Sequence, residues 1–314
     1  MFKTTGENWQ PPQHVDLIPD IGDITLIPNR DIKTSLREKL ETGGDKMLWL
    51  TDETPAEGFE SFESTSFEHV PEWAEGRKAS LQGVFFGRVT LGDEIETPVA
   101  VKPYLAAFNS GVHDAAMHLY LESRGLRVYR LLGMAWSKAQ GYVMITSFEE
   151  ESRSLDNVDW SKKWTSPIGE HLTNLEAIEQ VGQSLGLMHA SGVIHKDTQV
   201  QNFAVNGREV VLTDLTSART MVDDKGNIDE VGLATEMQAD LQMLVKSILG
   251  KGFLHGASSE ERAGFFLNVV APAYRSGLYR AENIAGSASS KFRATVETAI
   301  LDTFAYLEED KKAS

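Results

Sequence analysis

Cysteine is absent from this 314-residue sequence. Its absence excludes disulfide bonds, thiolate metal ligands and a cysteine nucleophile, and it fits a reducing cytoplasm, which is the location we expect. Long apolar runs are missing too, since nothing approaches the roughly 20 apolar residues of a membrane-spanning helix. The first twenty residues lack a basic flank followed by an apolar core, so they do not resemble a signal peptide. We therefore expect no membrane partner.

Basic residues are scarce as well, because 30 lysines and arginines stand against 46 acidic residues and give a net charge of −16. Sequence-independent nucleic-acid binding rests on a basic surface, so no nucleic-acid partner is expected. The negative charge would help to attract a cationic substrate, although a solvated acidic surface is the simpler interpretation. The length is sufficient for a sizeable core in one large domain or in two lobes.

The first half of the chain predicts a small antiparallel sheet with one helix. Residues 1–65 are mixed in character and form an N-terminal extension of unknown role. In residues 66–147, β-branched and apolar residues predict a hairpin over 83–105 and a helix over 113–125 that Gly125 ends. Two further strands are expected over 127–136 and 141–148. This part reads as a β-rich lobe.

Residues 148–314 predict a mainly helical second lobe, which makes the whole chain a bilobal α+β protein. An amphipathic helix is expected over 173–192, where apolar residues recur at three- and four-residue steps. The segment 208–218 follows a polar loop and predicts a strand that ends at Asp214. Further helices are expected over 235–250, 259–283 and 290–310.

The polar loop "GVIHKDTQVQNFAV" (192–205) carries Asp197 and Asn202 five residues apart, and Asp214 lies twelve residues beyond Asn202 at the end of an apolar segment. A histidine, two acids and an amide so close together would suit a catalytic loop. The alternative is a polar turn between a helix and a hairpin.

This loop resembles the catalytic loop of the protein-kinase-like superfamily, which includes eukaryotic-type protein kinases, RIO-type kinases and aminoglycoside phosphotransferases. The resemblance covers roughly residues 65–250 and rests on four motifs in order: "VAVK" with Lys102, "MITSFEEESRSLD", the loop itself and "VLTDLTSA". It implies a bilobal kinase-like fold, with an antiparallel β N-lobe over 66–147 and a mainly helical C-lobe over 148–314.

The resemblance also implies residue roles. Asp197 would orient or deprotonate the attacking hydroxyl, and Asn202 and Asp214 would hold Mg²⁺. Lys102 would contact the phosphates of ATP, paired with an acid of the following helix. We favour Asp114 for that acid, with Glu122 as the alternative.

Three further expectations concern binding and support. Backbone groups near Phe148, Glu149 and Glu150 would hydrogen-bond adenine in the hinge between the lobes. His195 would support the loop rather than act as a base, and Asp240 would brace the loop from a later helix.

The sequence also departs from the family's pattern. No G-x-G-x-x-G precedes Lys102, so a loop such as "EGRKAS" (75–80) would have to cover the phosphates. Asp214 is followed by Leu-Thr rather than Phe-Gly, no A-P-E sequence follows, and "RTMVDDKGNIDEV" (219–231) resembles a hairpin. Gln199 stands where protein Ser/Thr kinases usually carry lysine. These departures favour the small-molecule and atypical branches of the superfamily.

The expected function is therefore ATP- and Mg²⁺-dependent transfer of the γ-phosphate to a hydroxyl of a small molecule or protein. A cationic acceptor would suit the acidic residues Glu149–Glu151, Asp156 and Asp159, unless these are merely a solvated linker. The alternatives are a catalytically inactive kinase-like scaffold that binds nucleotide, a Ser/Thr protein kinase proper, and transfer of AMP or another group.

Two hydrolase readings are disfavoured. "GQSLG" (182–186) has the G-x-S-x-G pattern of a serine hydrolase, but Ser184 falls inside the amphipathic helix rather than at a strand-to-helix turn. His189 and His195 lack the H-E-x-x-H context of a zinc hydrolase.

Overall fold

The computed structural model describes most of the chain from Lys46 to Glu309. The described residues are 46–49, 60–61, 67–69, 84–91, 95–104, 108–137, 141–149, 152–160, 167–168, 172–221, 230–285 and 290–309. They fall into two compact units, whose described parts lie in Lys46–Ser152 and in Arg153–Glu309. Three features of the sequence analysis lie outside the described residues: the segment "EGRKAS" (75–80), Glu150, and the turn expected near residue 225.

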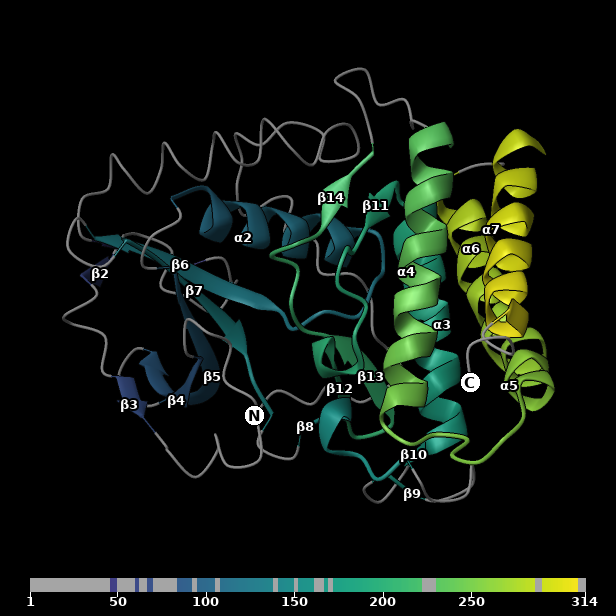
Figure 1. The fold of residues 1–314 in the computed structure, drawn as a ribbon. Helices are drawn as coiled ribbons and strands as arrows, with labels where there is room; N and C mark the ends of the chain where they lie inside the picture. Colours follow the sequence, from purple (N-terminus) through teal and green to yellow (C-terminus); the bar gives the residue numbers. More distant parts are fainter. Residues whose placement is uncertain are drawn as a thin grey trace. The chain divides into compact units, whose positions relative to one another are not determined.

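The first unit contains a seven-stranded antiparallel sheet in the order β2-β1-β6-β7-β5-β4-β3 (Figure 1). Its strands are β1 (Lys46–Trp49), β2 (Glu60–Ser61), β3 (Phe67–His69), β4 (Phe85–Leu91), β5 (Ile95–Tyr104), β6 (Leu131–Ser137) and β7 (Gly141–Ser147). The predicted hairpin is β4–β5, in which Phe85 lies opposite Val101 and Leu91 opposite Ile95. Strand β1 pairs with β6, so the N-terminal segment contributes to this sheet.

Helix α2 (Phe108–Ser123) packs on β5, β6 and β7 (Figure 1). Its buried face includes Val112, Ala116 and Leu119, at the three- and four-residue spacing of an amphipathic helix. The helix begins five residues before the predicted start. Gly125 follows it with a φ of 82°, a left-handed conformation that glycine adopts without strain and that ends the helix as predicted.

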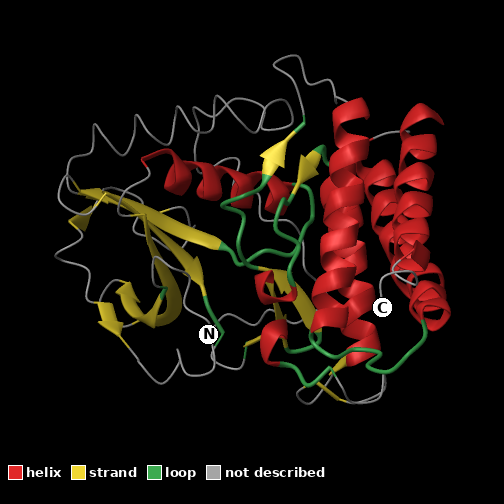
Figure 2. Cartoon of the chain, viewed as in Figure 1, coloured by secondary structure: helices red, strands yellow, loops and turns green. Residues whose placement is uncertain are grey.

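The second unit is mainly helical (Figure 2). Its helices are α3 (Asn174–Ala190), α4 (Glu230–Gly250), α5 (Ser259–Phe265), α6 (Ala271–Ala285) and α7 (Ser290–Glu309). One π-helical turn, η5 (Phe266–Val270), joins α5 to α6 without a break. Helix α3 packs on α6, and α4 packs on α7.

Short strands and turns accompany these helices. They are β8 (Arg153–Ser154), η3 (Leu155–Asn157), β9 (Pro167–Ile168), β10 (Leu172–Thr173), β11 (Val193–Ile194), η4 (Val200–Asn202), β12 (Phe203–Asn206), β13 (Glu209–Leu212) and β14 (Arg219–Thr220). The strand expected to end at Asp214 ends two residues earlier, at Leu212. Strand β14 pairs with β11 instead of with residues 230–231, which lie in α4. The hairpin expected over 219–231 is therefore wrong for these residues.

The "GQSLG" motif lies inside α3, as the sequence predicts, and its glycines serve helix packing. A Cβ atom built on Gly186 would lie 2.1 Å from the carbonyl oxygen of Tyr274, and one on Gly277 would lie 2.0 Å from that of Gln183. Only a hydrogen atom fits at either position, so these glycines allow the backbones of α3 and α6 to approach closely. Ser184 is on a helix, where it cannot form a nucleophile elbow.

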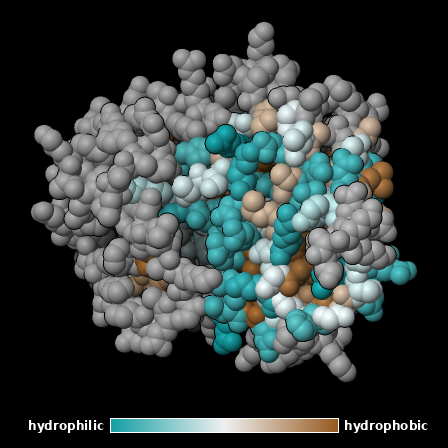
Figure 3. Space-filling model, viewed as in Figure 1, coloured by the Kyte–Doolittle hydropathy of each residue, from teal (hydrophilic) through white to brown (hydrophobic). Residues whose placement is uncertain are grey.

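Within the described residues, no helix is both long and apolar enough to cross a membrane. On the face drawn in Figure 3, hydrophilic residues predominate over the described helical elements, and the hydrophobic ones appear in small groups. Tyr279 and Leu301 are the large hydrophobic side chains exposed among the described residues.

We expect Gly186→Ala and Gly277→Ala each to lower the free energy of unfolding by about 1–3 kcal/mol or more, because the new methyl group overlaps a carbonyl oxygen of the facing helix. Gly264→Ala in α5 is the matched control. Its Cβ would meet no atom closer than 4.0 Å, so the better helix propensity of alanine should leave stability unchanged or raised. Urea unfolding of the three variants checks this, and equal stabilities would contradict it.

Candidate active site

The residues singled out in the sequence fall into two sets, one in each unit. The β-rich unit contains Lys102, Asp114, Glu122, Phe148 and Glu149. The helical unit contains the loop residues and their support, namely His195, Asp197, Asn202, Asp214 and Asp240.

Lys102 on β5 forms an ion pair with Asp114 on α2, with 2.9 Å between Nζ and Oδ2. The Tyr104 hydroxyl donates to the same carboxylate oxygen, since Lys102 and Tyr104 are two residues apart on one strand and point to the same face. On the other side, Nδ1 of His118 lies 3.1 Å from Oδ1 of Asp114. Of the two candidate acids, Asp114 is therefore the partner of Lys102.

The ionised form of Asp114 is favoured although its side chain is fully buried. Burial raises the pKa of this carboxyl, but the charge of Lys102 and the hydrogen bond from His118 outweigh it, so the pKa falls well below its usual range. The same pairing raises the pKa of His118 against the lowering effect of its own burial. The lysine is thus held by a carboxylate that stays charged throughout the physiological pH range.

Glu122, the alternative acid, has the opposite behaviour. It lies two helical turns beyond Asp114 on the same face of α2 and is 5% exposed. Burial raises its pKa to about 7, and the charges of Arg130 and His118 offset only part of that rise. Near neutral pH, Glu122 is therefore partly protonated.

The segment expected to contact adenine follows β7. Phe148 is buried against Phe86, with 4.7 Å between ring centroids, and its amide donates to the carbonyl of Pro98. The Glu149 carbonyl accepts from the amide of Ser152. The Phe148 amide is therefore engaged within the sheet, and contact between this segment and a nucleotide stays a prediction.

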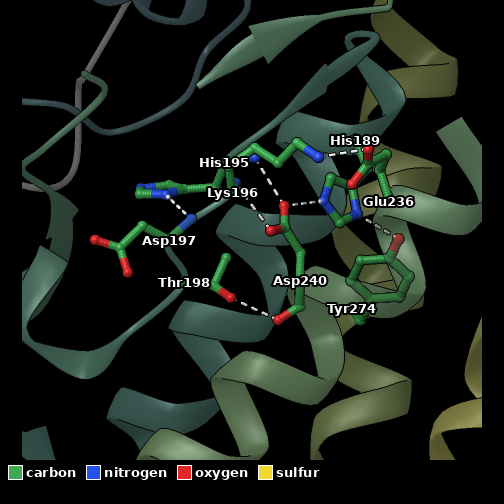
Figure 4. A network of polar contacts seen from close by, with 8 residues as sticks. All are labelled: His189, His195, Lys196, Asp197, Thr198, Glu236, Asp240 and Tyr274. Carbon is green, nitrogen blue, oxygen red and sulfur yellow. Dashed lines mark hydrogen bonds and ion pairs between the residues drawn. The ribbon is translucent and has the colours of Figure 1, made fainter. Parts of the chain in front are cut away.

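In the helical unit, the carboxylate of Asp240 holds the start of the polar loop (Figure 4). Its Oδ2 accepts from the amide of His195 at 2.7 Å, and its Oδ1 accepts from the amide of Lys196 at 2.9 Å. The Asp240 side chain is buried on α4. Burial raises the pKa of Asp240, but the hydrogen bond and charge of His189 and the His195 amide lower it by more. The pKa of Asp240 is therefore below its ordinary value.

Two more contacts fix the course of this loop. Lys196 has a φ of 69°, a left-handed conformation that is rare for a side chain larger than glycine, and its ammonium group pairs with Glu236 on α4. The Thr198 hydroxyl donates to the backbone oxygen of Asp240 at 2.5 Å. The loop is therefore bound to one turn of α4 on both sides of Asp197.

Asp197 itself accepts hydrogen bonds from two amide side chains. Asn202 Nδ2 lies 2.9 Å from Oδ2 and 2.7 Å from the backbone oxygen of Asp197. Gln199 Nε2 donates to Oδ1 at 2.8 Å. These two amides therefore hold the carboxylate of Asp197 in a defined direction.

Asn202 and Asp214 lie at the same end of the β12–β13 hairpin. Phe203 pairs with Leu212, and the Thr213 amide donates to the Asn202 carbonyl at 3.0 Å, so Asp214 follows directly. An amide oxygen and a carboxylate suit the hard oxygen coordination of Mg²⁺. Since the Asn202 amide nitrogen is used by Asp197, its oxygen Oδ1 would face the cation. Among the described residues, no group of three or more His, Cys, Asp or Glu side chains is placed to bind a metal, so substrate phosphates would complete such a site.

His195 has a supporting position. Its ring is fully buried and stacks on Phe203, and Nδ1 accepts from the Asp197 amide at 3.2 Å. Burial lowers the pKa of His195, and the nearby carboxylates offset only part of that shift. A buried neutral imidazole that bonds to backbone fits the role of a support, as the sequence reading expects.

The sequence reading missed His118, Tyr104, His189 and Tyr274. The first two lie one helical turn from Asp114 and two strand residues from Lys102, so spacing could have found them. His189 and Tyr274 are 85 residues apart, and only the packing of α3 on α6 brings them together. No local sequence signal indicates that contact.

No protein-family model and no curated protein matches the sequence. The solved structures that are similar to it include two with the following values. WaaP in complex with acyl carrier protein has 17% identity and a TM-score of 0.41, covering 75% of this chain and 91% of its own. The kinase domain of maize SIRK1, a sucrose-induced receptor kinase bound to AMP-PNP, has 12% identity and a TM-score of 0.41, covering 83% and 99%. At these values neither likeness assigns a ligand or an activity to this chain.

The predicted α+β organisation, a β-rich part with one helix followed by a mainly helical part, is confirmed by the elements of each unit. The β-rich unit has five strands, β1–β5, then helix α2, then β6 and β7, and all seven strands form one antiparallel sheet. The helical unit has a helix, a polar loop, a hairpin and further helices in the expected order.

We expect Glu122→Gln to remove a pH dependence of stability. The pKa of Glu122 is about 7 in the folded chain against an ordinary 4.5, so its contribution is fully present below pH 4.5 and is lost as the pH rises through 7. The difference between the two pKa values corresponds to a loss on the order of 3 kcal/mol in the free energy of unfolding. The variant should therefore gain stability relative to the wild type between pH 5 and pH 8, measured by urea unfolding across that range.

Asp114→Asn serves as the control of opposite sign. Removing the charged partner of buried Lys102 should lower the free energy of unfolding by about 3–5 kcal/mol at both pH values. The difference in free energy of unfolding between the wild type and Glu122→Gln should change between pH 5 and pH 8. A constant difference would show that Glu122 has no raised pKa.

Proposed function

We propose that this protein is an ATP- and Mg²⁺-dependent phosphotransferase that moves the γ-phosphoryl group of ATP to a hydroxyl acceptor. The observation that carries the proposal is the loop held by Asp240, on which Asn202 and Gln199 orient the carboxylate of Asp197. A bare polar turn has no need for a carboxylate held through both oxygens. The hairpin that places Asp214 next to this loop supports the same reaction.

The residues have the following roles in the proposal. Asp197 accepts the proton of the acceptor hydroxyl, whose oxygen forms a bond to the γ-phosphorus. The bond between the γ-phosphorus and the bridging oxygen breaks, ADP leaves, and the proton passes from Asp197 to solvent. Asn202 and Asp214 would hold Mg²⁺, which supplies positive charge to the phosphates when bound. Lys102, held by Asp114, would contact the same phosphates.

The acceptor is a small molecule rather than a protein in this proposal. Its support is Gln199, which binds Asp197 where protein Ser/Thr kinases usually carry a lysine. The acidic character of the chain would favour a cationic acceptor. The competing hypotheses are an inactive scaffold, a Ser/Thr protein kinase and an AMP transferase. ATP binding and turnover, measured on variants of Asp214 and Asp197, separate them.

Mg²⁺-ATP should raise the melting temperature of the wild-type protein, and Asp214→Ala should abolish most of that rise. At about 100 times its Kd, a ligand stabilises by roughly 2.7 kcal/mol, which a thermal-shift assay resolves easily. Asp302→Ala, at an exposed position on α7, is the control and should respond like the wild type. A wild-type protein that does not respond to Mg²⁺-ATP would rule out the nucleotide-dependent proposal.

Asp197→Asn should lower kcat about 10²- to 10⁴-fold, as expected for loss of a general base, while the stabilisation by Mg²⁺-ATP persists. ADP release in the presence of hydroxyl-bearing small molecules, with Asp302→Asn as control, measures this. ATP binding without turnover with any acceptor would identify an inactive scaffold. Phosphate or AMP found on added protein substrates would favour the protein-kinase or AMP-transfer readings.

A further inference from the structure

Three buried side chains connect α6 with the catalytic loop (Figure 4). The Tyr274 hydroxyl lies 2.6 Å from Nδ1 of His189, and Nε2 of His189 lies 3.1 Å from Oδ2 of Asp240. Tyr274 and His189 are fully buried, and Asp240 is 1% exposed. The same Oδ2 accepts the amide of His195, so the path runs from Tyr274 to the loop backbone through one carboxylate oxygen.

The carboxylate of Asp240 fixes the direction of its own hydrogen bond. The pKa of Asp240 is lowered, because the bond and charge of His189 and the His195 amide outweigh burial, so the carboxylate is ionised and only accepts. Nε2 of His189 therefore carries a proton. Nδ1 of His189 forms the other hydrogen bond, with the Tyr274 hydroxyl. Burial raises the pKa of Tyr274 well above its ordinary value, so the hydroxyl keeps its proton.

The backbone geometry leaves Tyr274 little freedom to move away from His189. Its carbonyl lies against Gly186 of α3, one turn before His189, where a Cβ atom would overlap it. The rings of His189 and Tyr274 meet edge to face, with 5.5 Å between their centroids. The π-helical turn η5 directly precedes α6 and sets the rotation of that helix, and such turns are frequent at functional sites.

We propose that Tyr274 is a positioning residue for the reaction: through its hydrogen bond with Nδ1 of His189 it fixes the imidazole that holds Asp240, and thereby fixes the backbone before Asp197. The inference rests on the proposed function for its kinetic consequence, but the loop geometry can be tested without turnover. Deleting the hydroxyl removes this hydrogen bond from Nδ1 of His189, and the buried ring can then rotate.

The decisive experiment is amide hydrogen exchange on Tyr274→Phe in the full-length chain. The amides of His195 and Lys196 should exchange about tenfold faster than in the wild type, the effect of losing one buried hydrogen bond, whereas amides of α7 should be unchanged. Tyr279→Phe is the matched control, because Tyr279 is on the same helix and 48% exposed. Unchanged exchange at His195 and Lys196 in Tyr274→Phe would overturn the proposal.

Kinetics form the second arm. When kcat is expressed per nucleotide-binding site, Tyr274→Phe should lower it about tenfold and leave the KM for ATP within twofold. Tyr279→Phe should change neither constant. Faster loop exchange with an unchanged kcat would reduce Tyr274 to a structural role and overturn the positioning role. If the wild type transfers no phosphate, the proposed function fails, and the exchange arm still decides whether Tyr274 holds the loop.

A third measurement covers the case in which Tyr274→Phe does not fold. In the wild type, ¹⁵N NMR of the His189 ring should show a protonated Nε2 and a hydrogen-bonded Nδ1. An Nδ1 without a hydrogen bond would exclude the contact with Tyr274 and overturn the proposal.

Discussion

The buried carboxylate of Asp240 is the interaction on which the candidate site depends. An ionised carboxylate in the interior is several kilocalories per mole unfavourable unless donors surround it, and here two backbone amides and His189 do so. Those amides belong to His195 and Lys196, and accepting both requires the left-handed turn at Lys196. The direction of the chain at Asp197 is therefore determined by a charge on α4, forty-three residues away in the sequence. Removing that charge would remove two hydrogen bonds that offset the strain at Lys196.

Three buried acids among the described residues show that nearby hydrogen-bond donors and charges, and not burial alone, decide the protonation state of each group. Asp114 and Asp240 are as buried as Glu122, yet their pKa values fall, because cationic or N–H donors lie within 3.1 Å of their oxygens. The pKa of Glu122 rises to about 7, because burial outweighs the charges of Arg130 and His118. Along one face of α2 the chain thus has a permanently charged acid and a titrating one, two turns apart. The permanent charge is the one that pairs with Lys102, which suits a lysine required to stay in place across the working pH range.

Local patterns were sufficient to predict most of the elements, and they failed where distant segments meet. The β4–β5 hairpin and α3 follow from periodicity and turn signals, which a single sequence contains, whereas the roles given to Lys102, Asp197, Asn202 and Asp214 rest on the resemblance to the kinase-like superfamily. The choice between Asp114 and Glu122 required the packing of α2 on β5, since both acids share one helical face. His189 and Tyr274 were missed because their contact depends on Gly186 and Gly277, whose role as packing surfaces is invisible in a motif search. The strand expected to end at Asp214 ends at Leu212, because β12 has only four residues with which to pair it.

The hydrogen bond from Gln199 to Asp197 bears on which kind of acceptor the site would suit. A lysine at that position would place a cation beside the carboxylate and near a transferred phosphate, whereas the amide supplies direction without charge. Under the proposed function, the positive charge on the phosphates must then come from Lys102 and from the cation held by Asn202 and Asp214. Both of the described side-chain donors to Asp197 are neutral amides, so neither brings a positive charge to its carboxylate. An acceptor that brings its own positive charge would gain most from that carboxylate, and the loop chemistry and the net charge of −16 thus favour the same class of small cationic alcohol.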